Sequence, residues 1–597
     1  MTTYQAPLSD MIFDIFELSG MSEISTLPGY EDVTPDLVEA ILGEAGKLGA
    51  EILAPLNKTG DEQGCKLENG VVRSPNGFKE AYRQFIDNGW NGMPFDPEYG
   101  GQGLPWLMAA AVSEIIQSAN MAFSLCPILT QGAVELLSAH GSDNLKATYL
   151  AQMISGEWNG TMNLTEPGAG SDLARISTKA VRDGDKYRIS GTKIFISYGE
   201  TDFTDNIIHM VLARLDDAPQ GIKGISLFVV PKFMVMEDGS LGHRNDLKAI
   251  SLEHKMGIHA SPTAVMSFGD NEGAVGYLVG EENHGIEYMF TMMNNARLSI
   301  GIQGVAIAER AYQKALAYAR ERVQSRKLGS DAREPAAIIE HPDVKRMLLS
   351  MKSKTEAARA MTFFVVGQLD ISKSHTDADA RSQAFAYVDL LTPVVKAWST
   401  DIGIEVANTG VQVHGGMGYI EESSAPQFLR DARIAAIYEG TNGIQALDLV
   451  GRKIGREGGK TVQHLIEKIR SFLKQLAQEK SPDFESIHIQ LSHTIDALEK
   501  STIWIVKTFP TNPTQVAAGA VPYLELLGRA MGGWLLAHSA QIANSRLASQ
   551  SGDPKHLKGK ILSAQFFADQ VLSGTKSLSE TIISGYRSVE AADESTF

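Results

Sequence analysis

The spacing of apolar residues divides the chain into a helical part, a strand-rich part and a second, longer helical part. Up to residue 157 apolar residues recur at helical spacing, as in T-P-D-L-V-E-A-I-L-G-E-A-G-K-L (34–48) and W-L-M-A-A-A-V-S-E-I-I-Q (106–117). From 158 to 282 the apolar runs are short, rich in β-branched residues and separated by Gly, Asp or Pro, which predicts strands. From 283 the helical spacing returns in long segments, 295–325, 342–370 and 381–412.

These segments predict four domains in chain order. We expect an N-terminal helical domain at 1–157, a β domain built as a small barrel or sandwich at 158–282, and a helical bundle at 283–455. A glycine- and charge-rich joint, G-R-K-I-G-R-E-G-G-K (451–460), leads to a C-terminal helical extension at 461–597. The predicted fold class is therefore mainly α with a central β domain.

The charge of the chain argues against a polyanionic partner. The 597 residues carry a formal net charge of −17, which repels the phosphates of nucleic acids and of anionic membranes. From residue 456 onward fifteen lysines and arginines stand against fourteen aspartates and glutamates, so the extension has no basic footprint. We expect no nucleic-acid partner.

Cysteine usage and the N-terminal segment bear on the compartment. The two cysteines, Cys65 and Cys126, do not make a disulfide framework, and a reducing cytoplasm is the default expectation. The acidic segment M-T-T-Y-Q-A-P-L-S-D-M-I-F-D resembles neither a secretory signal nor a transit peptide. No run of about 18 apolar residues stands out, so we expect no membrane span.

The segment with the clearest chemistry is I-Y-E-G-T-N-G (437–443), which places Glu439 between apolar residues and a glycine turn. Poor solvation disfavours the charged carboxylate, so the pKa of Glu439 should rise towards the working pH. Such a group suits a general base for a weakly acidic C–H bond. A helix-terminal glutamate before a glycine cap gives the same pattern, so this segment alone leaves both interpretations open.

Five further blocks occur in order along the chain. They are N-G-W-N-G-M-P-F-D-P-E-Y-G-G-Q-G (88–103), N-L-T-E-P-G-A-G-S-D (163–172), K-I-F-I-S (193–197), E-R-V-Q-S-R (321–326) and V-Q-V-H-G-G-M-G-Y (411–419). With I-Y-E-G-T they resemble the acyl-CoA dehydrogenase family of flavoproteins over most of 85–455. The segment Y-Q-A-P-L-S-D-M and the C-terminal extension are similar to the subfamily that includes 3-(methylthio)propionyl-CoA dehydrogenase.

The resemblance implies FAD-dependent conversion of an acyl-CoA thioester to a trans-2-enoyl-CoA. Glu439 corresponds to the base that removes the α-proton, while the flavin N5 takes the β-hydride. The family polarises the thioester carbonyl with the backbone N–H of this glutamate and a flavin hydroxyl. Gly440 suits a backbone that comes close to substrate. Some relatives carry the base at the position of Ala296, and alanine cannot accept a proton.

The same resemblance assigns the binding residues. Ser171 lies where flavin diphosphate and acyl-CoA meet, and Arg297 matches an arginine near the CoA nucleotide; with Gly440 they form the substrate-binding set. Phe195 as plain strand core and Arg297 as a solvated helix residue remain open alternatives. The cofactor-binding positions are Thr165, Ser171, Phe195, Ser197 and Thr441, with Arg322, Gln324, Ser325, Gln412 and Gly416 directed to the FAD of a neighbouring subunit.

Two positions depart from the family pattern. Arg175 stands where a small residue is usual, which bears on the CoA edge of the site. Gly443 replaces the usual glutamine two residues after Thr441, so that flavin contact is not carried over. A decorative glycine-rich loop at 165–172 remains an alternative to a flavin-binding turn.

The resemblance also implies partners. We expect an acyl-CoA substrate, electron-transferring flavoprotein as acceptor, and a homo-oligomer, with a dimer favoured. Medium- or long-chain acyl-CoA and 3-(methylthio)propionyl-CoA remain open as substrates. One rival is an acyl-CoA oxidase, which is reoxidised by oxygen. A non-catalytic relative is a second rival, but that interpretation expects a basic extension or loss of Glu439, and neither occurs.

Two motifs are excluded by their spacing. G-R-E-G-G-K-T (455–461) looks like a phosphate loop, but that motif needs a glycine five residues before the Gly-Lys pair, where this chain has Ile454. His254 and His259 suit neither one helix face nor a zinc knuckle, so we expect no metal. The G-x-G-x-x-G fingerprint is absent after any strand, so a flavin would be held without a Rossmann domain.

Overall fold

A computed structural model describes residues 4–329, 334–479 and 481–597. The chain forms two compact units. Unit 1 comprises Met1–Gly43, Ala110–Glu114 and Ile300–Phe597, and unit 2 comprises Glu44–Ala109 and Ile115–Ser299. The helices α3 (Pro35–Lys47), α6 (Trp106–Ala119) and α9 (Gly285–Glu321) contribute residues to both units.

Unit 2 contains an eight-stranded sheet with the order β10-β11-β5-β12-β7-β6-β3, and β4 pairs with both β5 and β6. Ladders join β5 to β12, β12 to β7, β7 to β6, β6 to β4 and β4 to β5, which closes five strands into a ring. The sheet is thus a small barrel with extra strands. Its strands are β3 (Trp158–Asn163), β4 (Lys179–Asp183), β5 (Lys186–Ser197), β6 (Asn206–Leu215), β7 (Ile225–Pro231), β10 (Leu247–Leu252), β11 (Thr263–Phe268) and β12 (Ala274–Leu278).

Burial explains the composition of the central strands. All residues of β6 except Arg214 are buried, because both faces of this strand are covered. β3 runs parallel to β6 and is buried at every position except Met162. Strands covered on both faces are expected to be nearly continuous apolar runs, as in N-I-I-H-M-V-L-A-R-L.

The helices of unit 2 include one, α7, that is unusually long and apolar. They are α4 (Ala54–Gln63), α5 (Phe78–Asp87), α7 (Met121–His140) and α8 (Asp143–Ser155), and a two-stranded hairpin, β1 (Lys66–Glu68) and β2 (Val71–Arg73), lies between α4 and α5. By length and composition alone α7 could cross a membrane. However, 83% of its apolar window is buried inside the protein, which is also typical of a core helix.

Unit 1 contains the bundle helices that follow the sheet in the chain. These are the part of α9 from Ile300 onward, α10 (Pro342–Ser374) and α11 (Ala378–His414), followed by the short α12 (Ala425–Ala432) and α13 (Asn442–Asp448). Small residues let α9 and α11 approach closely: a Cβ on Gly304 would lie 2.3 Å from the carbonyl oxygen of Ser399. Unit 1 also includes the N-terminal helices α1 (Leu8–Phe13), η1 (Asp14–Leu18) and α2 (Met21–Ile24).

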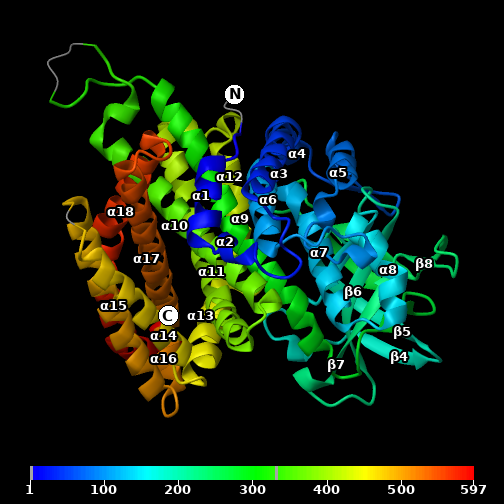
Figure 1. The fold of residues 1–597 in the computed structure, drawn as a ribbon. Coiled ribbons are helices and arrows are strands. Elements are labelled where there is room, and N and C mark those ends of the chain that lie inside the picture. The colour runs from blue at the N-terminus through cyan, green and yellow to red at the C-terminus, as the bar shows by residue number, and fades with distance from the viewer. Residues whose placement is uncertain (1–3, 330–333, 480) are drawn as a thin grey trace. The chain divides into compact units, whose positions relative to one another are not determined.

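The C-terminal extension packs against this bundle. Figure 1 shows α17 alongside α10 and α11. Trp398 of α11 is buried against Gly528 of α17, where a Cβ would lie 2.5 Å from the indole, and Phe364 of α10 meets Trp534 edge-on. The extension helices are α14 (Lys460–Leu476), α15 (Asp483–Thr508), α16 (Pro513–Ala518), α17 (Ala520–Ala548), α18 (Pro554–Gln570), α19 (Thr575–Ser584) and α20 (Tyr586–Ala591).

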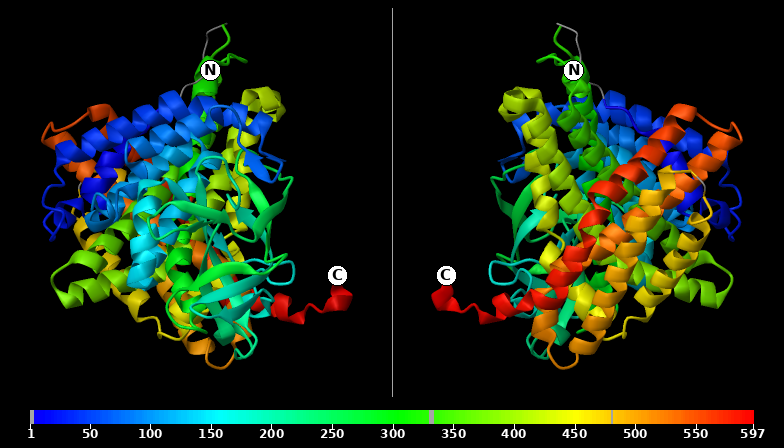
Figure 2. Two further views of the ribbon diagram at one scale, coloured as in Figure 1. Left: turned by 90° about the vertical axis from the view of Figure 1, so that its right-hand side faces the viewer. Right: turned by 90° about the vertical axis from the view of Figure 1, so that its left-hand side faces the viewer.

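The extension is a layer of helices with a projecting end. In Figure 2 the orange and red helices lie side by side, and the red C-terminal end of the chain projects beyond them. The predicted fold class, mainly α with a central β domain and an added helical extension, is confirmed. The first strand of the barrel region begins at Trp158 and α9 begins at Gly285; the four-domain boundaries remain a prediction.

Candidate active site

Glu439 lies in a tight turn of unit 1, directly before α13. Its φ is +56° and that of Gly440 is +82°, so two successive residues adopt the left-handed conformation. A non-glycine residue in this region is strained and persists only where its surroundings enforce it. The positive φ favours glycine at position 440, and an added Cβ would also lie 2.7 Å from the side-chain amide nitrogen of Gln445.

The carbonyl oxygens of this turn are bound from two helices. The Gln445 Nε2 group of α13 donates to the carbonyl oxygens of Glu439 and Gly440, at 3.1 and 3.3 Å. The Lys396 ammonium of α11 donates to the Gly440 oxygen at 2.9 Å. Thr441 accepts the Ile444 N–H at 3.3 Å and so caps α13. The helix therefore starts at a defined residue, Asn442, three residues after the glutamate.

The residue before the glutamate is also fixed. The Tyr438 hydroxyl donates to Gln303, a fully buried residue of α9. Burial of the phenol raises the pKa of Tyr438, so it remains a neutral donor. Glu439 itself is half-buried. The predicted rise of its pKa stays a prediction.

A second group of predicted residues meets where β5 ends, at the edge of the unit 2 sheet that is formed by strand ends. The strand β5 bulges opposite Val265, where Lys193 pairs with Met266 but Ile196 pairs with Ala264. The N–H of Ile194 in this bulge donates to the carbonyl oxygen of Thr165 at 2.9 Å. Thr165, predicted from one sequence block, is thereby brought to the same edge as Phe195 and Ser197, predicted from another.

The bulge turns Phe195 outward. Its φ is +60° and its side chain is 59% exposed, while Ile196 beside it is buried. The structure therefore excludes the alternative that Phe195 belongs to the strand core. A strained and exposed aromatic ring is a candidate surface for another planar group.

A buried ion pair fixes the backbone beneath this ring. Glu166 accepts from the backbone N–H and the hydroxyl of Ser177 at 2.7 and 2.6 Å, and from the same groups of Thr178 at 3.0 and 2.6 Å. The Lys193 ammonium lies 2.8 Å from Glu166 and donates to the Leu164 oxygen at 3.0 Å. Burial alone would raise the pKa of Glu166, but Lys193 and the hydroxyl donors hold it at about 2.

The turn that follows Glu166 is open. Glu166 and Ala169 exchange backbone hydrogen bonds, and Gly168 and Gly170 have no atom within 4 Å of an added Cβ. Ser171 and Arg175 are exposed. An exposed aromatic face, two hydroxyls and a turn with accessible backbone fit the ring and polar edges of a flavin. Thr165, Phe195, Ser197 and Ser171 would hold it in this unit.

Arg297 and Ala296 lie on α9 in unit 2. Arg297 is 8% exposed, donates to Asn294 at 3.1 Å and places its guanidinium 5.9 Å from the centre of the Phe290 ring. The structure therefore excludes the alternative of a solvated helix arginine. Ala296 is buried.

The residues predicted to face a neighbouring subunit lie at two adjacent helix ends in unit 1. Arg322, Gln324 and Ser325 follow α9, and all three are exposed. Gln412 and Gly416, also exposed, lie at the end of α11 and in η8 (Gly415–Tyr419). Stacking of Tyr318 on His414, at 4.4 Å between ring centres, joins the two ends. They lie apart from the Glu439 turn, because Gln412 is about 24 Å along α11 from Lys396 at 1.5 Å per residue.

Sequence reasoning missed the buried and half-buried residues that support these sites. They are Glu166, Lys193, Lys396, Asn442 and Gln445. A signal existed for two of them, because Lys193 and Lys396 are single charges inside apolar segments, I-S-G-T-K-I-F-I and T-P-V-V-K-A-W. A lysine in such a place must find buried acceptors.

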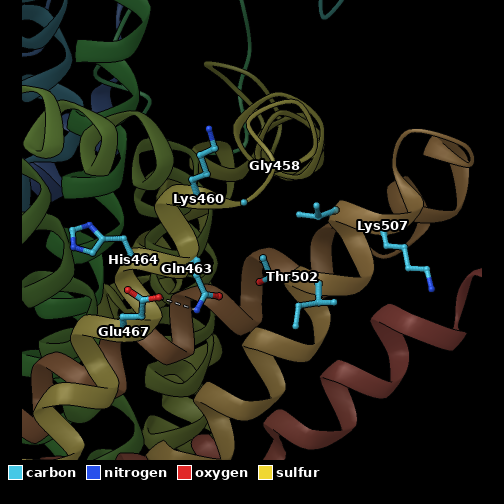
Figure 3. Close-up of a pocket in the computed structure, with 10 residues that line it drawn as sticks. Gly458, Lys460, Gln463, His464, Glu467, Thr502 and Lys507 are labelled. Atoms are coloured by element: carbon cyan, nitrogen blue, oxygen red, sulfur yellow. Dashed lines mark hydrogen bonds between the residues drawn. The ribbon is translucent and has the colours of Figure 1, made fainter.

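A hollow of about 640 Å³ in the extension contains none of the predicted site residues. It lies between α14 and α15, where Lys460 and Lys507 point away from each other and Gln463 donates to Glu467 (Figure 3). It adjoins the G-R-E-G-G-K-T segment at the start of α14. There the Glu457 carboxylate accepts hydrogen bonds from the Thr461 N–H, at 3.0 Å, and from the Thr461 hydroxyl. A phosphate would meet a carboxylate there.

One of the two histidines considered as a metal pair, His259, has other partners. His259 bonds the Asp61 side chain at 2.8 Å and the Lys255 carbonyl oxygen at 2.9 Å. Within the described ranges, no group of three or more His, Cys, Asp or Glu side chains is arranged to hold a metal ion.

Family models match the chain along most of its length. The "Acyl-CoA dehydrogenase, N-terminal domain" matches residues 42–157, the "middle domain" 161–271 and the "C-terminal domain" 283–454. A fourth model, "Acetyl-CoA dehydrogenase C-terminal like", matches 465–593. The glutamate turn and the extension thus fall in separate models.

Characterised relatives extend the comparison. A 3-methylmercaptopropionyl-CoA dehydrogenase of Ruegeria pomeroyi is 48% identical over 571 residues, 96% of each chain. A butyryl-CoA dehydrogenase of Syntrophomonas wolfei is 34% identical over 578 residues, 94% of each chain. A solved structure of an acyl-CoA dehydrogenase complexed with FAD from Bacillus anthracis has a TM-score of 0.75 at 20% identity, covering 98% of this chain and 92% of that one.

Proposed function

Because this chain belongs to the acyl-CoA dehydrogenase family of flavin oxidoreductases, we propose that it oxidises an acyl-CoA thioester to a trans-2-enoyl-CoA with Glu439 as the base. The carboxylate of Glu439 takes the α-proton, and the backbone N–H of the same residue donates to the thioester oxygen as enolate charge develops. A bound FAD supplies the acceptor for the β-hydrogen, which leaves as hydride.

The observation that supports this most is the form of the glutamate turn. Glu439 adopts a strained left-handed conformation that bonds from two helices enforce, and such strain gathers at functional sites. A glutamate that only ends a helix does not require this strained left-handed conformation. The assignment of FAD is supported by the exposed Phe195 ring beside Thr165 and Ser197.

For the substrate we propose 3-(methylthio)propionyl-CoA or another short acyl-CoA. The relative that is 48% identical over 96% of both chains carries that substrate in its name, and the 34% identical relative is named for butyryl-CoA. Loss of one α- and one β-hydrogen from 3-(methylthio)propionyl-CoA gives 3-(methylthio)acryloyl-CoA. Electrons then pass to electron-transferring flavoprotein.

We further propose a homodimer in which Arg322, Gln324, Ser325, Gln412 and Gly416 reach the partner's FAD. Exposed apolar side chains surround these positions: Val323, Leu328, Met417, Tyr419 and Ile420 are between 43% and 87% exposed. A cluster of that kind is typical of an interaction surface. Sedimentation should give a dimer, and Leu328→Glu with Tyr419→Glu should give monomers that lose flavin; a monomeric wild type that retains FAD would contradict the proposal.

The function is tested by anaerobic mixing of the purified flavoprotein with a panel of acyl-CoA substrates. We expect bleaching of the flavin and a product two mass units lighter, fastest with 3-(methylthio)propionyl-CoA or butyryl-CoA and slower with octanoyl- and palmitoyl-CoA. Absence of bleaching with every member would contradict the proposal. Rapid peroxide formation in air would instead identify an oxidase.

A further inference from the structure

Lys396 is a fully buried cation in the part of unit 1 that faces the glutamate turn. It lies in α11, its side chain is 0% exposed, and its ammonium donates to the Gly440 carbonyl oxygen at 2.9 Å and to the Asn442 Oδ1 at 2.8 Å. Removing an ammonium from water is costly unless its hydrogens are used. The two hydrogen bonds to the turn supply part of that compensation, and an apolar residue at this position could not donate them.

Asn442 connects this ammonium to the rest of the helix. Its Nδ2 donates to the Ala397 carbonyl oxygen at 3.1 Å, to the Thr400 hydroxyl at 3.0 Å and to the Asp401 carboxylate at 2.8 Å. Residues 396, 397, 400 and 401 follow one another on one face of α11. Asn442 thus attaches the first turn of α13 to a single helix face through both ends of its amide.

The two side chains act on the residues that set the direction of the glutamate. Glu439 and Gly440 are both left-handed, and the Gly440 carbonyl oxygen receives hydrogen bonds from Lys396 and Gln445. Asn442 lies two residues after Gly440, so Lys396 bonds the turn at two points, one on the backbone and one on a side chain. Rotation of the Gly440 peptide would break the first bond and would change the direction of Glu439.

We propose that Lys396 and Asn442 are positioning residues for the base: together they hold the Glu439–Gly440 turn so that the carboxylate meets the α-carbon in a single orientation. The inference rests on the proposed role of Glu439. It adds two residues that touch neither substrate nor cofactor in this proposal and act only through the turn. A misplacement of about 1 Å at a reacting group can reduce a rate by about 100-fold.

The test compares Lys396→Met and Asn442→Ala with a matched control, Lys560→Met. Lys560 is also a buried lysine of unit 1, 2% exposed, and it pairs with Asp10 at 2.7 Å instead of with the glutamate turn. All variants are compared at equal flavin content. The measurements are kcat and KM for the substrate, amide hydrogen exchange of the peptide covering 437–443 in the protein without substrate, and the urea midpoint.

We expect kcat to fall about 100-fold in Lys396→Met and about 10-fold in Asn442→Ala, with KM changed less than about threefold. The amides of 437–443 should exchange faster in both variants. Lys560→Met should lose stability but keep wild-type kcat and wild-type exchange in this peptide. If Lys396→Met does not fold, Asn442→Ala carries the test, because Asn442 is only half-buried.

The inference is overturned if Asn442→Ala and any folded Lys396→Met keep wild-type kcat and exchange, or if Lys560→Met lowers kcat equally. Failure of the proposed function gives a different result. In that case Glu439→Gln turns over normally, whereas the exchange measurement on 437–443 still reports whether Lys396 and Asn442 hold the turn.

Discussion

The two regions that carry the predicted chemistry are each supported by a buried lysine, but the lysines have different partners. At the edge of the sheet in unit 2, Lys193 pairs with the carboxylate of Glu166, which accepts four further bonds from Ser177 and Thr178. At the glutamate turn in unit 1, Lys396 donates to a backbone carbonyl oxygen and to an amide oxygen. The first arrangement anchors a loop through charge, and the second orders a backbone turn.

The difference shows what each region must do. A flavin-facing edge has to be rigid, and a carboxylate with five donors keeps strand and loop in one arrangement. A general base has to remain reactive, so its surroundings are fixed through the backbone of the turn, and the buried cation is directed at carbonyl oxygens. A buried lysine therefore makes the loop and strand rigid in unit 2, and in unit 1 it orients the turn that carries the base.

The largest expected effect on stability comes from breaking the Glu166–Lys193 pair. Burial already lowers the pKa of Lys193 to about 8, and Glu166→Gln removes the counter-charge that favours its charged form, so we expect a loss of about 3–5 kcal/mol in the free energy of unfolding. Lys193→Met should cost less, about 1–2 kcal/mol, because Glu166 keeps its four bonds to Ser177 and Thr178. Urea unfolding measures both, and flavin retention should fall with stability. Equal losses, or a larger loss in Lys193→Met, would contradict this asymmetry.

A smaller effect is expected where a buried carboxylate lacks such donors. Asp14 of η1 lies 3.6 Å from Lys560, and its Oδ2 has no hydrogen-bond partner. Burial raises the pKa of Asp14 to about 7, against the lowering by Lys560 and Arg359, while Asp10 and Glu356 raise it further. The folded state therefore binds a proton that the unfolded chain releases near 3.8, and stability decreases as the pH rises from about 4 to about 7.

Asp14→Asn removes this dependence. The stability of the variant relative to the wild type should rise by about 3 kcal/mol between pH 4.5 and pH 8. Urea midpoints of both proteins at the two pH values test this. A difference that does not change with pH would show that Asp14 is ionised in the folded protein throughout this range.

The smallest effect on stability is expected at Phe195. Its side chain is exposed and its φ is +60°, so Phe195→Gly relieves strain and should change the free energy of unfolding by less than about 1 kcal/mol. The same change should still weaken flavin retention, because the planar surface is lost. Phe195→Tyr, which keeps the ring, is the control. If Phe195→Gly retains as much flavin as the wild type, Phe195 does not contribute to cofactor binding.

The local sequence pattern was sufficient to predict the order of helices and strands and to single out Glu439 as a candidate base. The change from helical to strand spacing near residue 158 follows from which faces are buried, and Glu439 is marked by its place before Gly440. Membrane propensity could not be judged in this way, because α7 is apolar enough to cross a bilayer and only its burial in unit 2 accounts for it.

The local sequence pattern could not predict hydrogen bonds and ion pairs between residues that are far apart in the chain. Lys193 meets Glu166 across 27 residues, and Lys396 meets Gly440 across 44, so no local spacing relates them. The outward turn of Phe195 depends on a bulge that is defined by its register with β11. Each of these features arises only when the strands and helices have paired.

The most direct measurement of the central claim is anaerobic rapid mixing of Glu439→Gln with the best acyl-CoA substrate, at a flavin content equal to that of the wild type. The amide cannot take the α-proton, so flavin reduction should slow by about 10⁴-fold while acyl-CoA binding persists. Reduction of the flavin at the wild-type rate would contradict the assignment of Glu439 as the base.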